Sequence, residues 1–153
     1  MKYLFTLLFL LSPFSFAEDE ISLLHLKPPN KTEDPNTLWV WTSAESDCEI
    51  TKKQLQKIVE GSLIRSRIKP ADEYTDPSLS VQLKCMNVST FNPIFDLTTR
   101  FGYFDFARDS SVFFGRQYNK LGMGQKKMDI ETVIKDSVDE AMEDYIRANF
   151  LVD

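Results

Sequence analysis

The spacing of apolar residues changes twice along this chain, and it restricts the fold more than any other feature of the sequence. Between Leu55 and Leu63 apolar residues recur every three or four positions, as on one face of a helix. From Leu79 to Cys85 every second residue is apolar, as on one face of a strand. The helical spacing returns over residues 130–146. This pattern predicts two helices that pack against a sheet.

Further features indicate where the elements begin and end. Residues 38–42 combine two tryptophans with β-branched side chains, which favours a strand. The tetrapeptide from Thr51 to Gln54 matches a capping box at the start of a helix, and Pro70 is expected to end that helix. Turn and cap residues predict three more elements: strands at 94–106 and 111–118, paired as a hairpin, and a last helix that begins at Asp129.

The order of these elements is strand, helix, strand, strand, strand, helix. It predicts an α+β two-layer sandwich, in which an about four-stranded, mostly antiparallel sheet carries both amphipathic helices on one face. In element order alone the chain is similar to small helix-on-sheet domains of bacterial envelope assembly and secretion proteins, such as the amino-terminal domain of the Tol system's propeller protein. The similarity rests on no motif and identifies no family.

Residues 1–17 have the organisation of a secretory signal peptide. Lys2 supplies the positive start, residues 3–11 form an apolar run too short to span a bilayer comfortably, and small residues precede the expected cleavage after Ala17. Residues 18–37 contain three prolines among polar residues and are expected to form an extended N-terminal arm. Residues 38–153 are then expected to form a single α+β domain.

The charge balance of the chain restricts the kinds of partner that it can bind. The chain has 18 basic and 23 acidic residues, and loss of residues 1–17 removes one lysine, which leaves a net charge of about −6. This acidic balance argues against nucleic acid as a partner, and the basic residues between 52 and 69 are interpreted as a solvated helix face.

No second apolar stretch reaches the roughly 20 residues of a membrane span, so no stable membrane insertion is expected after cleavage. We predict a water-soluble protein in the periplasm, with an extracellular location as the alternative.

Cys48 and Cys85 are the only cysteines of the chain. In an exported protein, an even number of cysteines is most simply explained by a disulfide, and we predict that these two residues are bonded. The alternative is a pair of buried free thiols. The alternating pattern places Cys85 on the inner face of its strand, so the bond would tie the segment after the first strand to the second strand.

The sequence contains no convincing catalytic, metal or cofactor site. His25 is the only histidine and lies in the predicted arm, so neither a metal cluster nor a base for Ser110 or Ser111 is expected. The glycines at 122 and 124 lack the spacing of a nucleotide-binding loop and are interpreted as a flexible connection. We therefore expect a protein that is not an enzyme and that uses no cofactor.

Aromatic residues on predicted strands suggest how such a protein would bind. Two helices cover only one face of a sheet, so Trp39 and Trp41 are candidates for the open face, together with Tyr103. On the strand at 94–106, either Phe101 and Tyr103 or Phe104 and Phe106 would face outward. Two structural alternatives remain: residues 18–37 fold over this face, or the rings belong to the core.

These observations lead to two functional hypotheses. The first is an exported, periplasmic, non-enzymatic binding or adaptor protein of the bacterial cell envelope, whose partner is another envelope or exported protein. Its aromatic residues would make the contact, and the acidic last helix would discourage wrong partners; an inhibitor or immunity-type protein is a narrower version. The second is a periplasmic carrier of a small apolar ligand, with a cavity between sheet and helices lined by Ile58, Leu83, Phe101 and Met142. The sequence settles neither the partner nor the oligomeric state.

Overall fold

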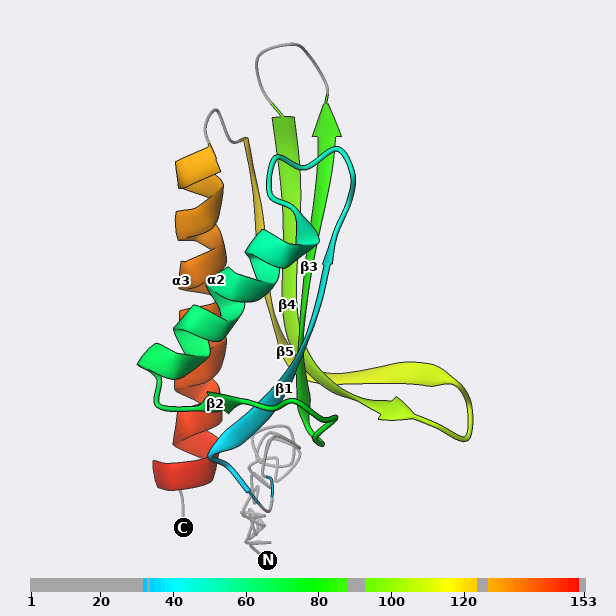
Figure 1. Cartoon of the computed structure of the whole chain (residues 1–153), viewed down its shortest axis with the longest axis vertical. Coiled ribbons are helices and arrows are strands. Elements are labelled where there is room, and N and C mark those ends of the chain that lie inside the picture. Colours follow the sequence, from blue (N-terminus) through cyan, green and yellow to red (C-terminus); the bar gives the residue numbers. More distant parts are fainter. Residues whose placement is uncertain (1–31, 33, 88–92, 124–126, 152–153) are drawn as a thin grey trace, which may run out of the picture.

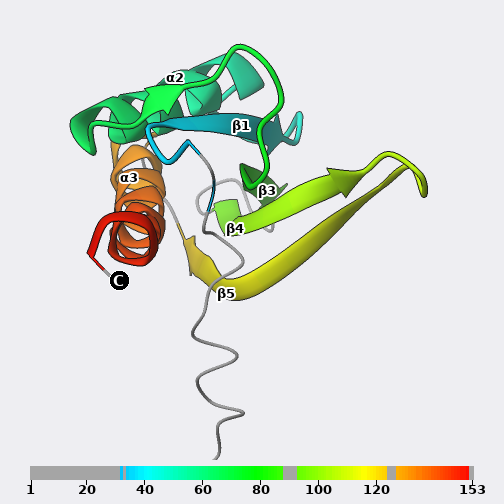
Figure 2. The same cartoon turned by 90° about the horizontal axis from the view of Figure 1, so that it is seen from below.

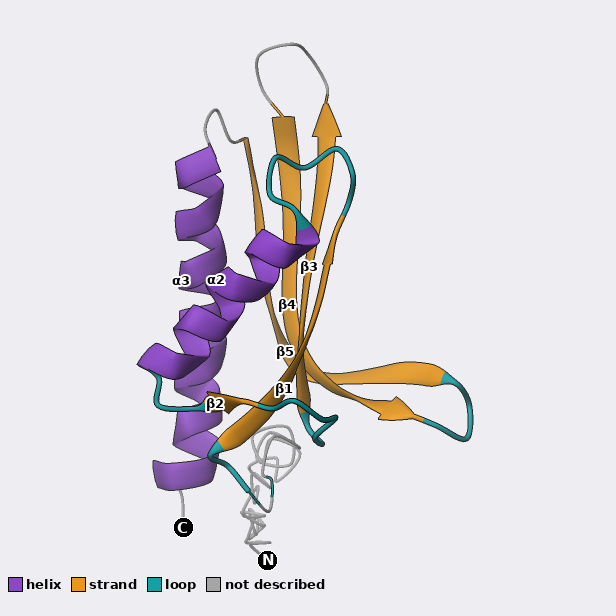
Figure 3. Ribbon diagram, viewed as in Figure 1, coloured by secondary structure: helices purple, strands orange, loops and turns teal. Residues whose placement is uncertain are grey.

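The computed structural model describes residue 32 and residues 34–87, 93–123 and 127–151 of the 153-residue chain. They form a mixed α+β fold with one open sheet and two long helices (Figures 1 and 3). The predicted signal peptide at 1–17 lies outside the described residues, as does the predicted arm up to residue 31.

The sheet has five described strands in the order β2-β1-β3-β4-β5, one more than expected. β1 pairs in parallel with β2 and β3, whereas β3, β4 and β5 pair antiparallel in sequence order. The sheet is therefore mixed, although its antiparallel ladders are the longer ones. The strands are β1 (Thr37–Ala44), β2 (Lys69–Pro70), β3 (Ser78–Asn87), β4 (Pro93–Asp105) and β5 (Ser110–Met123).

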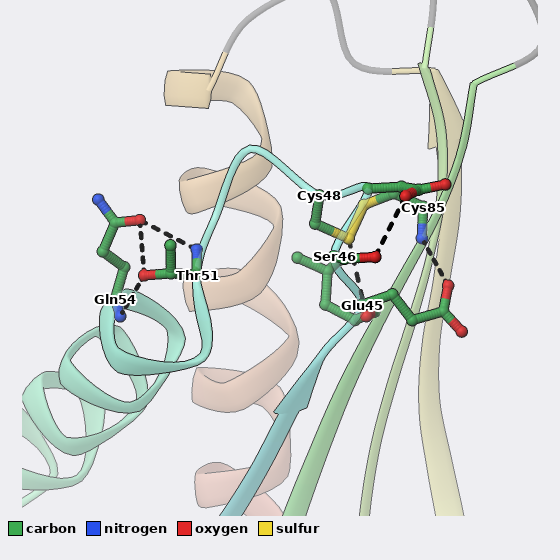
Figure 4. The surroundings of a disulfide bond; sticks show 8 residues. Glu45, Ser46, Cys48, Thr51, Gln54 and Cys85 are labelled. Atoms are coloured by element: carbon green, nitrogen blue, oxygen red, sulfur yellow. Dashed lines mark hydrogen bonds between the residues drawn. A yellow bond between two sulfur atoms is a disulfide. The ribbon is translucent and has the colours of Figure 1, made fainter.

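The first helix, α2 (Lys52–Arg65), begins as the sequence predicts. Thr51 Oγ1 accepts a hydrogen bond from the Gln54 backbone N–H, and the Gln54 side chain accepts one from the Thr51 backbone (Figure 4). The end of the helix was wrongly placed: α2 ends at Arg65, well before Pro70. Arg67 adopts a left-handed conformation with φ 62°, which turns the chain so that Pro70 lies in the short strand β2 at the sheet edge.

The second helix, α3 (Lys127–Ile146), begins two residues before the expected cap at Asp129 and continues into a π-helical turn (Arg147–Leu151). Figures 1 and 2 show α2 and α3 on the same side of the sheet. The apolar stripe expected on the last helix is largely confirmed by its buried residues, which are Ile130, Ile134, Val138, Ala141, Met142 and Tyr145.

The hydrophobic core lies between the helices and one face of the sheet. On β3 the alternating residues from Leu79 to Cys85 are buried, and on β4 the ring of Phe101 stacks on Tyr145 of α3 with centroids 5.7 Å apart. A buried polar link also crosses this layer: Ser137 Oγ lies 2.9 Å from Thr99 Oγ1 and 2.8 Å from the Tyr118 carbonyl oxygen. This bond satisfies polar groups that would otherwise be buried without partners.

The disulfide between Cys48 and Cys85 is confirmed (Figure 4). It joins two residues 37 positions apart and ties the segment after β1 to the inner face of β3. Glu45 reinforces the same connection, because its backbone N–H donates to the Leu83 carbonyl at 3.1 Å and its side chain accepts from the Cys85 N–H at 3.3 Å. The disulfide therefore fixes the segment that leads from β1 into α2.

The expected hairpin of β4 and β5 is present, but its outer part bends away from the sheet. The pairing register shifts between Thr99 and Phe101, and Gly115 on the opposite strand has a φ of 73°. A bulge of this kind bends and twists the strands that contain it. Residues 102–113, which we call the hairpin arm, project beyond the other strands in Figures 1 and 2.

Removal of the disulfide is expected to destabilise the protein by about 4 kcal/mol, because closure of a loop of this length restricts the unfolded chain. The Cys48→Ser, Cys85→Ser double variant is compared with the oxidised wild type by urea unfolding. A free energy of unfolding that stays within about 1 kcal/mol of the wild-type value would contradict the structural role of the bond.

Two glycines provide a matched test of the hairpin geometry. A Cβ atom at Gly102 would lie 2.5 Å from the Val112 carbonyl oxygen, whereas one at Gly61 in α2 would meet only the Arg65 side chain at 3.8 Å. Gly102→Ala is therefore expected to lower the free energy of unfolding by about 1–3 kcal/mol, and Gly61→Ala to raise it by about 0.5–1 kcal/mol. Chemical denaturation measures both, and equal effects of the two substitutions would contradict the close approach of β4 and β5.

Candidate functional site

A cavity of about 440 Å³ opens on the face of the sheet opposite the helices. Its lining is mainly aromatic, and we call it the aromatic cleft. The lining residues are Trp39, Trp41, Tyr74, Ser78, Ser80, Tyr103, Phe104, Phe106, Ser111 and Phe113. They come from β1, β3, the hairpin arm and the loop that precedes β3.

Strand alternation places both indoles of β1 in the cleft. Leu38, Val40 and Thr42 are buried toward the helices, where Thr42 Oγ1 hydrogen-bonds Gln56 of α2 at 2.8 Å. The residues between them face the other way because successive side chains of a strand point to opposite faces. Trp39 is half-buried, and Trp41 is 39% exposed.

Two serines of β3 form the floor of the cleft between the indoles and the hairpin arm. Ser78 is the register partner of Trp39, and Ser80 is the partner of Trp41. Their small side chains leave space where larger residues would fill the face. Ser78 Oγ donates to the Gly102 carbonyl at 3.0 Å, whereas the buried Ser80 Oγ has no partner among the described residues.

Tyr74 closes one side of the cleft and holds the hairpin arm. Its ring makes edge contacts with Trp39 and Phe106, at centroid distances of 5.4 and 5.6 Å. Its hydroxyl oxygen accepts a hydrogen bond from the Phe104 backbone N–H at 2.6 Å. Burial of the hydroxyl raises the pKa of Tyr74, so the group stays protonated at neutral pH. The tyrosine thus joins β1 to the arm through both packing and a hydrogen bond.

The hairpin arm supplies the remaining wall. The sequence alternative that places Phe104 and Phe106 on the open face is confirmed for both residues, but Tyr103 of the other alternative faces the cleft as well. Phe101 lies in the core, whereas Tyr103, Phe104 and Phe106 all line the cleft. The arm leaves the sheet at this point, so residues of both strand faces reach the cavity. Tyr103 is 37% exposed and Phe106 is 73% exposed, which extends the apolar surface beyond the cavity itself.

Arg100 lies beside the cleft on the same face of the sheet. Its neighbours Thr99 and Phe101 point toward the helices, and its guanidinium carbon lies 3.4 Å from the ring centroid of Phe113. Burial lowers the pKa of Arg100 below its ordinary value, although the group remains charged at neutral pH. Its Nε has no hydrogen-bond partner within the described ranges.

The structure brings the predicted residues Trp39, Trp41 and Tyr103 together around one cavity. Sequence reasoning missed Tyr74, whose acidic loop has no periodic pattern. It also missed Ser80, although the alternation of β3 places this residue on the open face.

The cavity expected between sheet and helices is a different location from the aromatic cleft. Of its four expected lining residues, Leu83, Phe101 and Met142 are at most 1% exposed in the core, and Ile58 packs against that core.

The described part of the predicted arm does not lie over the aromatic cleft. The backbone N–H of Thr32 donates to the side chain of Asn149, and the hydroxyl of Tyr145 donates to the Pro35 carbonyl. This segment therefore runs along the end of α3. The prediction that the arm covers the open face concerns residues 18–31 as well, and these lie outside the described part of the chain.

The cleft has the chemistry of a binding surface. None of the described residues that line it carries a carboxylate, imidazole or amino group. Within residues 34–87, 93–123 and 127–151, no group of three or more His, Cys, Asp or Glu is placed to hold a metal ion. No helix in these ranges is both long and apolar enough to cross a membrane. Aromatic walls with a few hydroxyl groups are suited to contact with apolar groups.

Comparisons with known proteins add little to this geometry. No family model matches the chain, and no curated protein matches its sequence. Solved structures that resemble it include two PelC dodecamers from Paraburkholderia phytofirmans, each 11% identical in sequence. One covers 75% of this chain and 88% of its own with a TM-score of 0.47, and the other covers 77% and 91% with a TM-score of 0.49. A minor lipoprotein from Acinetobacter baumannii is 11% identical over 74% of this chain and 90% of its own, with a TM-score of 0.35. At these values the likeness supports no functional argument.

Tyr74 offers a test of how the cleft is held together. Tyr74→Phe keeps the ring contacts but leaves the Phe104 N–H without its acceptor, so exchange of this amide and its neighbours in the arm is expected to accelerate roughly fivefold, as for loss of about 1 kcal/mol. Tyr74→Ala should accelerate exchange further because the ring contacts are also lost. Hydrogen exchange by NMR measures both variants, and unchanged protection in the two would show that the arm is held by other contacts.

Proposed function

We propose that this protein is an exported, periplasmic, non-enzymatic binding protein of the bacterial cell envelope, and that it binds another envelope or exported protein through the aromatic cleft. The observation that carries the proposal is the grouping of Trp39, Trp41 and Tyr103 around one cavity on the sheet face opposite the helices. Aromatic residues of this kind dominate the binding energy of many protein interfaces.

The rings of the aromatic cleft are already in place before a partner binds. Trp39 and Tyr74 brace each other by an edge contact, so little side-chain freedom is lost when a partner covers them. Burial of the exposed parts of Trp41 and Tyr103 then stabilises the complex by about 25 cal/mol per Å² of apolar surface removed from water. Truncation of one such central ring typically costs about 2–4 kcal/mol of binding free energy.

Export is supported by two features. Residues 1–17 have the pattern of a signal peptide, and the Cys48–Cys85 disulfide is typical of proteins in oxidising compartments. We therefore place the protein in the periplasm, with the extracellular space as the alternative.

The negative charge of α3 gives little support to the narrower hypothesis of an inhibitor or immunity-type protein that binds a basic partner. Four of the seven acidic residues of α3 pair with basic groups of the same chain: Asp139 with Arg65, Glu140 with Arg116 and Lys120, Glu143 with Arg147, and Asp144 with Arg116. Asp144 accepts a hydrogen bond from the Tyr118 hydroxyl at 2.7 Å. Much of the negative charge on this helix is thus already compensated, so the aromatic cleft carries the proposal without a charge-based role for α3.

A carrier of a small apolar ligand is a second candidate, and the size of the cleft favours it. A volume of about 440 Å³ lies within the usual range of small-molecule pockets. The site would then be the aromatic cleft on the open face, and not the sheet–helix interior expected from the sequence. The exposed rings around the rim favour a larger partner, because a small ligand inside the cavity would leave them in water.

A capture experiment tests the proposal. The mature protein is immobilised and exposed to a periplasmic extract, beside a Trp39→Ser, Trp41→Ser variant. Loss of both indoles is expected to reduce capture of the specific partner at least tenfold. The matched control is Leu121→Ser, Met123→Ser, which removes two residues that are 77% and 71% exposed but lie outside the cleft.

The control variant should capture the partner as the wild type does. Equal loss of capture in both variants would indicate nonspecific binding to exposed apolar surface. Undiminished capture by the tryptophan variant would refute a role for the cleft. Near-ultraviolet circular dichroism of the tyrosines and resistance to urea establish that each variant is folded.

A further inference from the structure

Three residues of adjacent strands form a row across the open face of the sheet. Trp41 of β1 is the register partner of Ser80 of β3, and Ser80 is the register partner of Arg100 of β4. Because neighbouring strands lie about 4.8 Å apart, the row places an aromatic wall, a hydroxyl and a cation within roughly 10 Å. Trp41 and Ser80 line the cleft, and Arg100 stacks on Phe113, which also lines it.

The two polar members of this row have unused hydrogen-bonding capacity. Ser80 lines the cleft and is 3% exposed, and its buried Oγ has no partner among the described residues. The Nε of Arg100 is also buried without a partner, and no described carboxylate forms an ion pair with this residue. A buried polar group without a partner costs free energy, so an occupant that reaches these groups and supplies an acceptor would gain that energy on binding.

The chemistry of such an occupant follows from the row. The hydroxyl and the guanidinium both donate to oxygen, and the guanidinium favours an anion, so a carboxylate satisfies both. Trp41 lies one strand away from Ser80, so the apolar part of the ligand must be attached close to the carboxylate. The last residue of a polypeptide has this arrangement, because its carboxylate and its side chain are bonded to the same carbon atom.

We propose that the row Trp41–Ser80–Arg100 recognises the carboxyl terminus of a partner polypeptide that ends in an apolar residue. This inference rests on the proposed function and deepens it, because it names the group that enters the aromatic cleft. The terminal side chain lies against the aromatic walls, and its carboxylate accepts hydrogen bonds from Ser80 and Arg100. The rest of the partner covers the rim, where Tyr103 and Phe106 are exposed; a free small acid would leave that rim in water.

Two small probes that differ in one group test the proposal. N-acetyl-phenylalanine carries the ring and a free carboxylate, and N-acetyl-phenylalaninamide carries the same ring with a neutral amide. Each is titrated into the mature protein while the indole N–H signals of the two tryptophans are followed by NMR. The acid is expected to bind roughly tenfold more tightly than the amide, since a hydrogen bond to a charged group is lost in the latter.

Variants of the row identify the source of that preference. Arg100→Gln should bind the acid and the amide equally, and Ser80→Ala should reduce the preference. Arg108→Gln is the matched control: it removes the same charge from the exposed hairpin tip, where Arg108 pairs with Asp105, and should keep the full preference. A preference that survives in Arg100→Gln, or equal binding of acid and amide by the wild type, would overturn the proposal.

The outcomes separate this inference from the proposed function. If neither probe binds, the row does not recognise a carboxyl terminus. The capture experiment still tests separately whether the cleft binds a protein. Octanoate serves as a free acid without a peptide group. Tighter binding of octanoate than of N-acetyl-phenylalanine, with the same dependence on Arg100, would overturn the polypeptide as the source and assign the site to free amphiphilic acids.

Discussion

The packing of both helices on one face of the sheet is the constraint on which the rest of this structure depends. The core forms where α2 and α3 meet the inner residues of β1, β3 and β4, and strand alternation then fixes what the opposite face presents. On β1 the consequence is direct, because burial of Leu38 and Val40 places Trp39 and Trp41 on the other side. The aromatic cleft therefore lies on the sheet face that points away from the core, and strand residues whose side chains do not enter the core line it.

The cleft also needs a wall, and the bent hairpin provides it. A regular antiparallel hairpin would continue the sheet, whereas the bulge near Arg100 and the close approach at Gly102 direct the arm away from it. Tyr74 then joins the arm to β1 through ring contacts and a hydrogen bond. A hollow results because the floor between these two walls consists of Ser78 and Ser80, whose side chains are too small to fill it.

The parts of the fold set by local patterns were predictable, and the parts set by long-range geometry were not. The capping box at Thr51, the stripe of α3 and the disulfide follow from spacing and residue type within one segment or one pair. The strand at Lys69–Pro70 was missed because two residues are too few to show a periodic pattern, and because a proline after a helical segment is typical of a helix end. The faces of the arm residues were not predictable, because alternation left two phases open for this strand, and because Tyr103 and Phe104 both line the cleft where the arm leaves the sheet. Strand alternation assigned the two tryptophans to one face, whereas Tyr74, which contacts Trp39, lies in a loop without a periodic pattern.

The central claim is that the aromatic cleft of the folded protein is open to solvent. Collisional quenching by acrylamide tests it most directly, because the chain has only two tryptophans and both line the cleft. Single-tryptophan variants, Trp39→Phe and Trp41→Phe, separate the two signals. The structure predicts that Trp41 in the native protein is quenched at an appreciable fraction of the rate for free tryptophan, and Trp39 less strongly. Native indoles that become accessible to the quencher only after unfolding in urea would contradict the claim.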